Sequence, residues 1–374
     1  MVDLALSAMA LAVHGRLQHD QEALTAASRK YTALLPKCHD WISQQGRPSP
    51  NEIDSGLLTI FLMARYENTV HQPGWYPTRS SIQSLRSWSH HDGAIAMLRL
   101  WYDNHKHTAA SLVVRQTRRG ASKSCLLRDL LLPDFLSDGE VFGEIGADLE
   151  YDRVFVKSIN LHYESTRLRE AKEVTVSDIE RLDREGVELD FMLKAWMEGL
   201  GPTYSFTEHT VSDPGPWPRK HIYSPQVNVF DNLHTASTWC KYFATRMLIG
   251  VTVWRALVKL RPEAEQEVHR SRVNRPLNVV ADNLAASIPF CLERVELCSK
   301  QKQGKEVRTV KLSMNNIIKP YLVGLVAMPL SIACRIDCMD AKQQQWFRSE
   351  LGELGRITGD GGLECAESEQ WVKL

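Results

Sequence analysis

The chain has 374 residues, of which 43% are apolar, so it is long enough to bury a sizeable core and general disorder is excluded. Lys plus Arg and Asp plus Glu both number 45, which gives a formal net charge of zero. A chain that binds DNA by itself usually carries an excess of basic residues. Because this chain has none, we expect weak or no direct DNA binding by it.

Helical spacing dominates the first half of the chain. Apolar residues recur at steps of three and four from position 4 to about 35, and the run 4–13 lacks the basic start of a signal peptide, so it is interpreted as a buried helix. Ser49 followed by Pro50 and Glu52 has the pattern of a capping box at a helix start. Further helices are predicted at about 81–102, 108–131 and 150–172.

In the middle of the chain, Ser177 and Glu180 suggest a second capping box, which would open a helix running through Trp196. Five prolines then interrupt the helical pattern and predict a long irregular crossing at about 201–225. Within 219–230 a short extended piece is expected.

The last third returns to helical spacing, and its one strongly polar stretch, 300–311, is interpreted as a solvated loop. The apolar run 321–334 is bracketed by charges and too short for a membrane span, so no membrane association is expected. Helices are predicted at about 231–260, 276–298, 314–336 and 340–357.

Taken together, the pattern predicts an all-α protein, a multi-helix bundle or array, because helical segments far outnumber candidate strands. We expect a single helical domain over 1–374, within which 1–200 and 226–374 are candidate subdomains.

The stretch SWSHHDGAIAML, residues 87–98, holds the densest set of candidate ligands, His90, His91 and Asp92, with His105 and His107 downstream. Adjacent residues on a helix point about 100° apart, so the histidine pair cannot share a small metal site as an i, i+4 pair can. The favoured interpretation is helix packing.

Other candidate sites also have structural explanations. The glycine-containing segments 143–148 and 359–362 lack the features of phosphate loops and predict turns. Cys334 and Cys338 could form half of a metal site, but the eight cysteines are scattered without a CxxC pair, which favours reduced, mostly buried thiols. Glu67 and Asp282 are helix carboxylates without visible partners. No residue is therefore assigned as catalytic, cofactor-binding or metal-ligating, and no cofactor is expected.

Eight segments, in order, resemble the regulatory region of the fungal-specific transcription factor family. Each is a short, mostly apolar pattern, and together they are spread along the chain from position 4 to position 366. The segments are LALSAMALAVHGRL (4–17), KYTALLPKCHDWI (30–42), LLTIFLMARYE (57–67), SWSHHDGAIAML (87–98), FDNLHTASTWCKYFATRMLI (230–249), NVVADNLAASIPFCL (278–292), YLVGLVAMPLSIA (321–333) and WFRSELGELGRITGDGGLECA (346–366).

The resemblance implies a nuclear, non-enzymatic transcriptional regulator, controlling a gene cluster for secondary metabolism or nutrient use. The family pairs this region with an N-terminal binuclear zinc cluster that needs six closely spaced cysteines. Cys38 is the only cysteine before position 125, so that module is not within this chain. The expected partners are the transcription machinery or a DNA-binding partner.

Two other functions stay open: a small-molecule-binding co-regulator that does not contact DNA, and an enzyme of a biosynthetic pathway that uses His90, His91 or Asp92. A homodimer and a small-molecule effector are also compatible with the resemblance. The sequence further predicts that Trp239, Tyr242 and Arg246 share one face of a helix packed against 287–290, with Asp282 as the partner of the arginine.

Overall fold

The computed structural model describes residues 1–43, 46–72, 87–211, 215–259, 263–302, 305–313, 317–336, 338–368 and 371. Two compact units emerge: unit 1 comprises Met1–Ile159 with Gly352–Val372, and unit 2 comprises Asn160–Leu351. The prediction of one domain over 1–374 stays a prediction.

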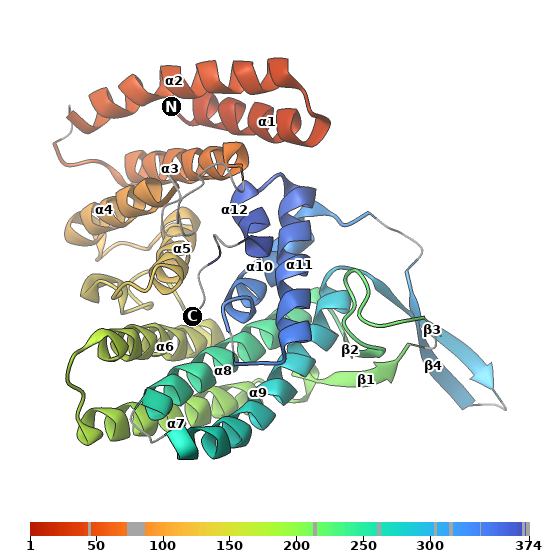
Figure 1. Cartoon of the computed structure of the whole chain (residues 1–374). Coiled ribbons are helices and arrows are strands. Elements are labelled where there is room, and N and C mark those ends of the chain that lie inside the picture. Colours follow the sequence, from red (N-terminus) through yellow and green to blue (C-terminus); the bar gives the residue numbers. More distant parts are fainter. Residues whose placement is uncertain are drawn as a thin grey trace. The chain divides into compact units, whose positions relative to one another are not determined.

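Unit 1 is a stack of helices; Figure 1 draws its first part, α1 to α5, from red to yellow and its C-terminal part, with α12, in blue. α1 packs on α2 and α3, and α3 packs on α4, α5 and α12. The helices are α1 (Val2–Gln18), α2 (Gln21–Ser43), α3 (Pro50–Val70), α4 (Ser87–His105), α5 (Leu112–Leu127), the short η2 (Asp134–Leu136), the first part of α6 (Gly146–Glu170), the end of α11 (Ala341–Thr358), α12 (Gly361–Glu364) and η4 (Cys365–Glu367).

The helical spacing from 4 to about 35 belongs to two helices, α1 and α2. The chain turns at His19, whose φ of 56° lies in the left-handed region, and the Asp20 side chain then accepts hydrogen bonds from the first backbone N–H groups of α2. Small side chains set the spacing, because Ala8, Ala12 and Ala27 are all fully buried between α1 and α2. The buried helix predicted at 4–13 is confirmed.

The segment after α11 returns to α3 through charged contacts. Arg65 on α3 pairs with Asp360 and also donates to the Thr358 carbonyl oxygen at 2.6 Å. Gly361 lies against the backbone carbonyl of His71, where any Cβ would overlap the oxygen, so only glycine fits this approach. The stretch 359–362 makes the predicted turn and also begins α12. Asp360 caps this helix by accepting a hydrogen bond from the backbone N–H of Leu363.

The Arg118–Asp152 ion pair joins α5 to α6 inside unit 1. Arg118 is fully buried and its two terminal nitrogens bond to the Asp152 carboxylate at 2.6 and 2.8 Å. Its Nε donates to the Leu136 carbonyl oxygen at 2.9 Å, which fixes the irregular segment between the helices. A buried guanidinium must be neutralised and hydrogen-bonded, and this geometry does both.

Unit 2 combines helices with two antiparallel strand pairs. α8 is the central helix, in contact with α7, α9, α10 and β2. The elements are the rest of α6, α7 (Val176–Gly199), η3 (Pro202–Tyr204), β1 (Phe206–Thr210), β2 (Gln226–Phe230), α8 (Leu233–Lys259), α9 (Glu263–Cys291), β3 (Val295–Lys302), β4 (Lys305–Leu312), α10 (Pro320–Ala333) and the first part of α11.

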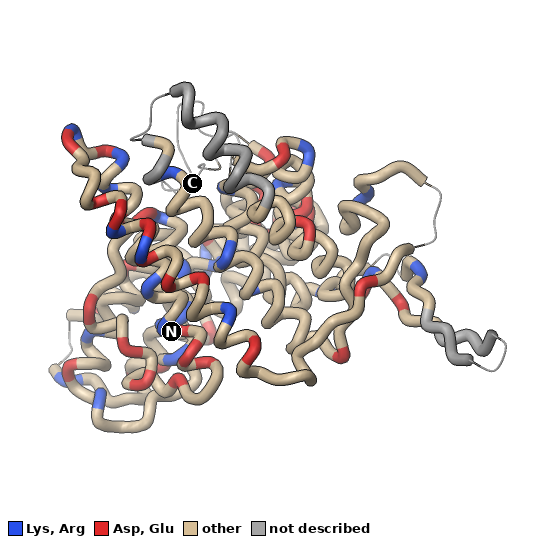
Figure 2. Tube along the Cα trace, turned by 90° about the horizontal axis from the view of Figure 1, so that it is seen from below, with Lys and Arg blue, Asp and Glu red and all other residues tan. Residues whose placement is uncertain are grey.

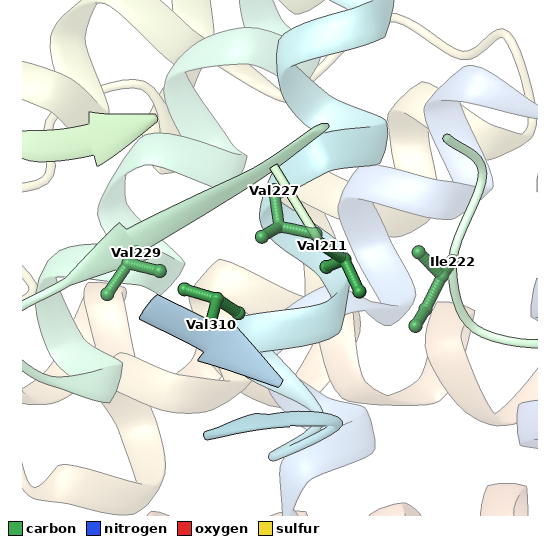
Figure 3. Packing of buried hydrophobic residues seen from close by; sticks show 5 residues of the cluster. All are labelled: Val211, Ile222, Val227, Val229 and Val310. Atoms are coloured by element: carbon green, nitrogen blue, oxygen red, sulfur yellow. The ribbon is translucent and has the colours of Figure 1, made fainter. Parts of the chain in front are cut away.

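A small valine cluster holds the strands together. Val227 and Val229 point to the same face of β2, as alternate strand residues do, and meet Val310 of β4. Figure 3 shows Val211 and Ile222 completing the cluster from the irregular crossing. The extended piece expected within 219–230 is confirmed as β2.

The prediction of a loop at 300–311 is wrong, because the described residues 300–302 and 305–311 lie in β3 and β4, which pair antiparallel with Val295 opposite Leu312. Polar composition suggested a loop, whereas burial of Val310 gives the hairpin a tertiary anchor. Helical spacing suggested a helix to 298. The helix α9 ends at Cys291 instead, because the residues from Val295 onward pair with β4 as strand β3.

The capping box of α7 lies two residues before the one predicted. Thr175, not Ser177, caps the helix: its hydroxyl accepts from the Asp178 backbone N–H, and the Asp178 carboxylate accepts from the backbone N–H of Thr175. Ser177 with Glu180 and Thr175 with Asp178 both have the spacing of a capping box. Which of the two caps the helix depends on where the preceding loop ends.

The all-α class is confirmed, since helices make up most of the described chain and the strands form only two-stranded pairs there. The predicted crossing at 201–225 is present, although β1 interrupts its irregular course. Among the described helices, none has the length and apolar character needed to cross a membrane.

Removing the buried guanidinium should destabilise the protein. Arg118→Ala leaves the Asp152 carboxylate buried and unpaired, so we expect the free energy of unfolding to fall by about 3–5 kcal/mol. Arg153→Ala is the matched control, because Arg153 is exposed and lies 3.4 Å from an exposed carboxylate of Glu140; it should cost less than about 1 kcal/mol. Urea unfolding followed by circular dichroism measures both, and equal losses would contradict the assignment.

Candidate functional site

A hydrogen-bonded cluster joins α2, α3 and α4 in unit 1. The Tyr31 hydroxyl donates to Glu67 Oε1 at 2.8 Å and lies 3.0 Å from Nε2 of His90. The Tyr31 ring stacks on Tyr66, with ring centroids 4.1 Å apart. Glu67, which had no visible partner in the sequence, therefore has one, and three separated segments meet at a single hydroxyl group.

Burial sets the protonation of this cluster. Desolvation, followed by the hydrogen bond to Glu67, raises the pKa of Tyr31, and desolvation lowers the pKa of His90. The hydroxyl therefore keeps its single proton, which goes to Glu67. Nε2 of a neutral His90 must then carry the proton that it donates to the Tyr31 oxygen. At neutral pH each donor in the cluster therefore faces an acceptor: His90 donates to Tyr31, and Tyr31 donates to Glu67.

His91 and Asp92 belong to a separate group on the next face of α4. The His91 ring packs against Trp88 at 4.9 Å, and Asp92 accepts two hydrogen bonds from Arg128, the shorter at 2.6 Å. Desolvation, reinforced by the Arg128 charge, lowers the pKa of His91 to about 4. The two histidines thus have different partners, as their 100° separation predicts.

The downstream histidines do not join either group. His105 Nε2 lies 2.8 Å from the Pro48 carbonyl oxygen, and His107 is exposed after the end of α4. Within the described ranges, no group of three or more His, Cys, Asp or Glu side chains could hold a metal ion. Gly93 in the same stretch does not mediate a close backbone approach, since a Cβ there would meet only an Ile60 methyl at 3.9 Å.

The Trp239, Tyr242 and Arg246 stripe lies on α8, and its partners differ from those predicted. α8 does pack against α9, but the stripe faces elsewhere: Trp239 Nε1 donates to the Tyr204 carbonyl oxygen at 2.8 Å, and Arg246 pairs with Asp190 at 2.7 Å. Asp282 is therefore not the partner of Arg246.

Asp282 instead accepts a hydrogen bond from Gln343 Nε2 at 2.8 Å. Asp190 was missed because its helix is far from α8 in sequence and only tertiary packing brings the two together.

The cysteines form a contact that spacing could not reveal. Sγ of Cys240 on α8 lies 3.6 Å from Sγ of Cys291 on α9, with both side chains fully buried as free thiols. Cys334 follows the last residue of α10, so Cys338 is not one helical turn along the same helix. Burial raises the pKa of the Cys334 thiol. These thiols have the surroundings of core side chains.

A groove in unit 2 opens where the start of α8, the end of α9 and the hairpin of β3 and β4 meet. It has a volume of about 450 Å³ and carries two carboxylates, Glu293 and Glu296. Glu293 pairs with Lys319 at 2.5 Å, and Glu296 accepts from the Ser313 hydroxyl at 2.7 Å. The lining residues are Asn232, Leu233, Phe290, Glu293, Val295, Glu296 and Ser313. No sequence pattern pointed to this groove, because the segment that forms the hairpin was predicted to be a loop.

No family model matches the chain, and searches of the curated proteins and of the solved structures find no match.

The tyrosine hydroxyl at the centre of the cluster should contribute to stability. Tyr31→Phe leaves Glu67 and His90 without their shared partner, so the free energy of unfolding should fall by about 1–3 kcal/mol. Tyr102→Phe is the control, since the contacts of the Tyr102 ring with Phe135 and Phe142 are kept by phenylalanine. Chemical denaturation of both variants measures this free energy. An unfolding free energy of Tyr31→Phe equal to that of the parent would show that the hydroxyl does not contribute to stability.

The depressed histidine pKa predicts acid sensitivity. Between the ordinary value of 6.5 and about 4, the unfolded chain binds a proton at His91 that the folded chain does not. Stability is therefore full above pH 6.5 and falls as the pH drops toward 4, by at most about 3 kcal/mol from this residue. His91→Gln should flatten the dependence of unfolding free energy on pH, whereas the exposed control His107→Gln should not. Identical slopes for parent and His91→Gln would refute this.

Proposed function

We propose that this chain is the regulatory helical region of a fungal-type transcriptional regulator that acts in the nucleus without enzymatic activity. The Tyr31–Glu67–His90 cluster carries the proposal. Each of its three residues comes from a different segment of the resemblance, and the fold brings all three to one point. Patterns that match a family by chance have no reason to converge in space.

The chemistry of the cluster supports a non-enzymatic role. A general base must present a basic atom to a substrate, whereas His90 Nε2 is engaged by Tyr31 and the His91 ring is packed on Trp88. Asp92 is held by Arg128. The enzyme alternative needs at least one of these groups to face a substrate, whereas each of the three already has a contact within unit 1.

The charge distribution supports a role in which another module contacts DNA. Acidic and basic residues are interspersed along the described trace in Figure 2, with no basic stripe in that view. Together with the zero net charge, this favours partners such as the transcription machinery or a DNA-binding protein. The target would be a gene cluster for secondary metabolism or nutrient use.

A small-molecule-binding co-regulator is the second candidate, and the groove beside the hairpin favours it. Its volume of about 450 Å³ falls within the range of about 300–1,000 Å³ typical of ligand pockets. The carboxylates of Glu293 and Glu296 would favour a cationic or hydrogen-bond-donating effector.

Deleting the gene should change the transcript levels of a set of other genes, measured by RNA sequencing. A chain with His90→Gln and His91→Asn should restore most of that output, because the amides keep polarity and approximate size without imidazole chemistry. A folded double variant that behaves like the deletion would favour the enzyme alternative. Unchanged transcripts in the deletion strain, with one pathway intermediate accumulating, would overturn the regulator proposal.

A further inference from the structure

One face of α7 is apolar and exposed to solvent. Val187 and Phe191 lie one turn apart with exposed fractions of 64% and 71%, and Ala195 continues the line on the next turn. The opposite face is buried and includes Leu182, Leu189 and Leu193, so the exposed line is not needed for packing within the unit. A phenylalanine this exposed, beside another large apolar residue, is the kind of surface that partners cover.

The charges around Phe191 are arranged symmetrically about it. Arg184 and Glu198 each lie seven residues from Phe191, on opposite sides and on the same exposed stripe. At about 100° per residue both project within about 20° of its direction. Among the described residues neither makes an ion pair. The stripe therefore ends in one unpaired positive and one unpaired negative charge, equally far from an apolar centre.

This arrangement is complementary to itself in one orientation. When two copies of α7 lie antiparallel with Phe191 at the twofold axis, Arg184 of each copy reaches the level of Glu198 of the other. The Phe191 rings meet at the centre, and Val187 lies at the level of Ala195 of the second copy. A parallel pair would instead place like charges side by side. Self-complementary patches of this kind make isologous twofold contacts.

We propose that the exposed face of α7 is a homodimer surface, which pairs antiparallel with α7 of a second copy of this chain about a twofold axis at Phe191. The stripe from Arg184 to Glu198 is about 21 Å long and one helix wide. That is smaller than the ~800 Å² per partner of standard stable complexes, so the dimer is weak and depends on concentration, with Kd in the micromolar range. For a regulator, such a surface makes pairing responsive to local concentration.

Sedimentation equilibrium of the full chain from about 1 to 300 µM tests the proposal at low salt. The dimer fraction should rise with concentration, and Phe191→Glu should abolish it by placing two carboxylates at the axis. Ile145→Glu is the matched control: Ile145 is as exposed but lies in unit 1, and the change should leave association intact. Far-UV circular dichroism checks that each variant is folded.

Exchanging the charges at positions 184 and 198 distinguishes specific antiparallel pairing from non-specific association. Arg184→Glu alone, or Glu198→Arg alone, turns both symmetric pairs into repulsive contacts and should raise Kd about tenfold. The double variant with both changes should recover to within about threefold of the parent. A parent that stays monomeric over the whole range, a Phe191→Glu protein that still dimerises, or a double variant as weak as the single ones would each overturn the proposal.

Discussion

A buried charged side chain must find its counterpart within the fold, and this requirement organises both units. In unit 1 the fully buried Arg118 is matched by Asp152 and by a carbonyl oxygen of η2. In unit 2 the buried Glu350 of α11 accepts both the backbone N–H and Nδ1 of His221, at 2.6 and 2.7 Å. His221 has a φ of 65°, an unfavourable conformation for a side-chain-bearing residue, and these two bonds offset its cost. These bonds tie irregular segments to the helices of each unit.

The same requirement explains why the adjacent histidines have structural partners. Histidine on a half-buried helix face loses hydration, which favours the neutral form and demands a hydrogen bond for the polar nitrogen. Tyr31 supplies that bond for His90, while His91 packs its ring on Trp88. A group of polar residues that could suggest catalysis is therefore explained by helix packing, and this agrees with the proposed regulatory role.

The groove beside the hairpin and the exposed stripe of α7, both in unit 2, differ in what they can recognise. The groove beside the hairpin is concave and carries carboxylates, which fits a small ligand, whereas the α7 stripe is a single helix face with an apolar centre, which fits another helix. A regulator responds to an effector when two states bind it with different affinity. The proposed self-association through α7 would provide one such pair of states, the monomer and the dimer.

The sequence by itself determined the all-α class, the capping box at Ser49 and the buried helix of 4–13, because these depend on local spacing. Only tertiary structure decided the hairpin at 300–311, whose polar residues gain an anchor from Val310, and the partner of Arg246, which is Asp190 and not Asp282. It also decided that Tyr31, Glu67 and His90 meet. Local preferences act over one or two helical turns, whereas the partner of a buried polar group is set by which distant helices pack together, and no spacing within one segment encodes that.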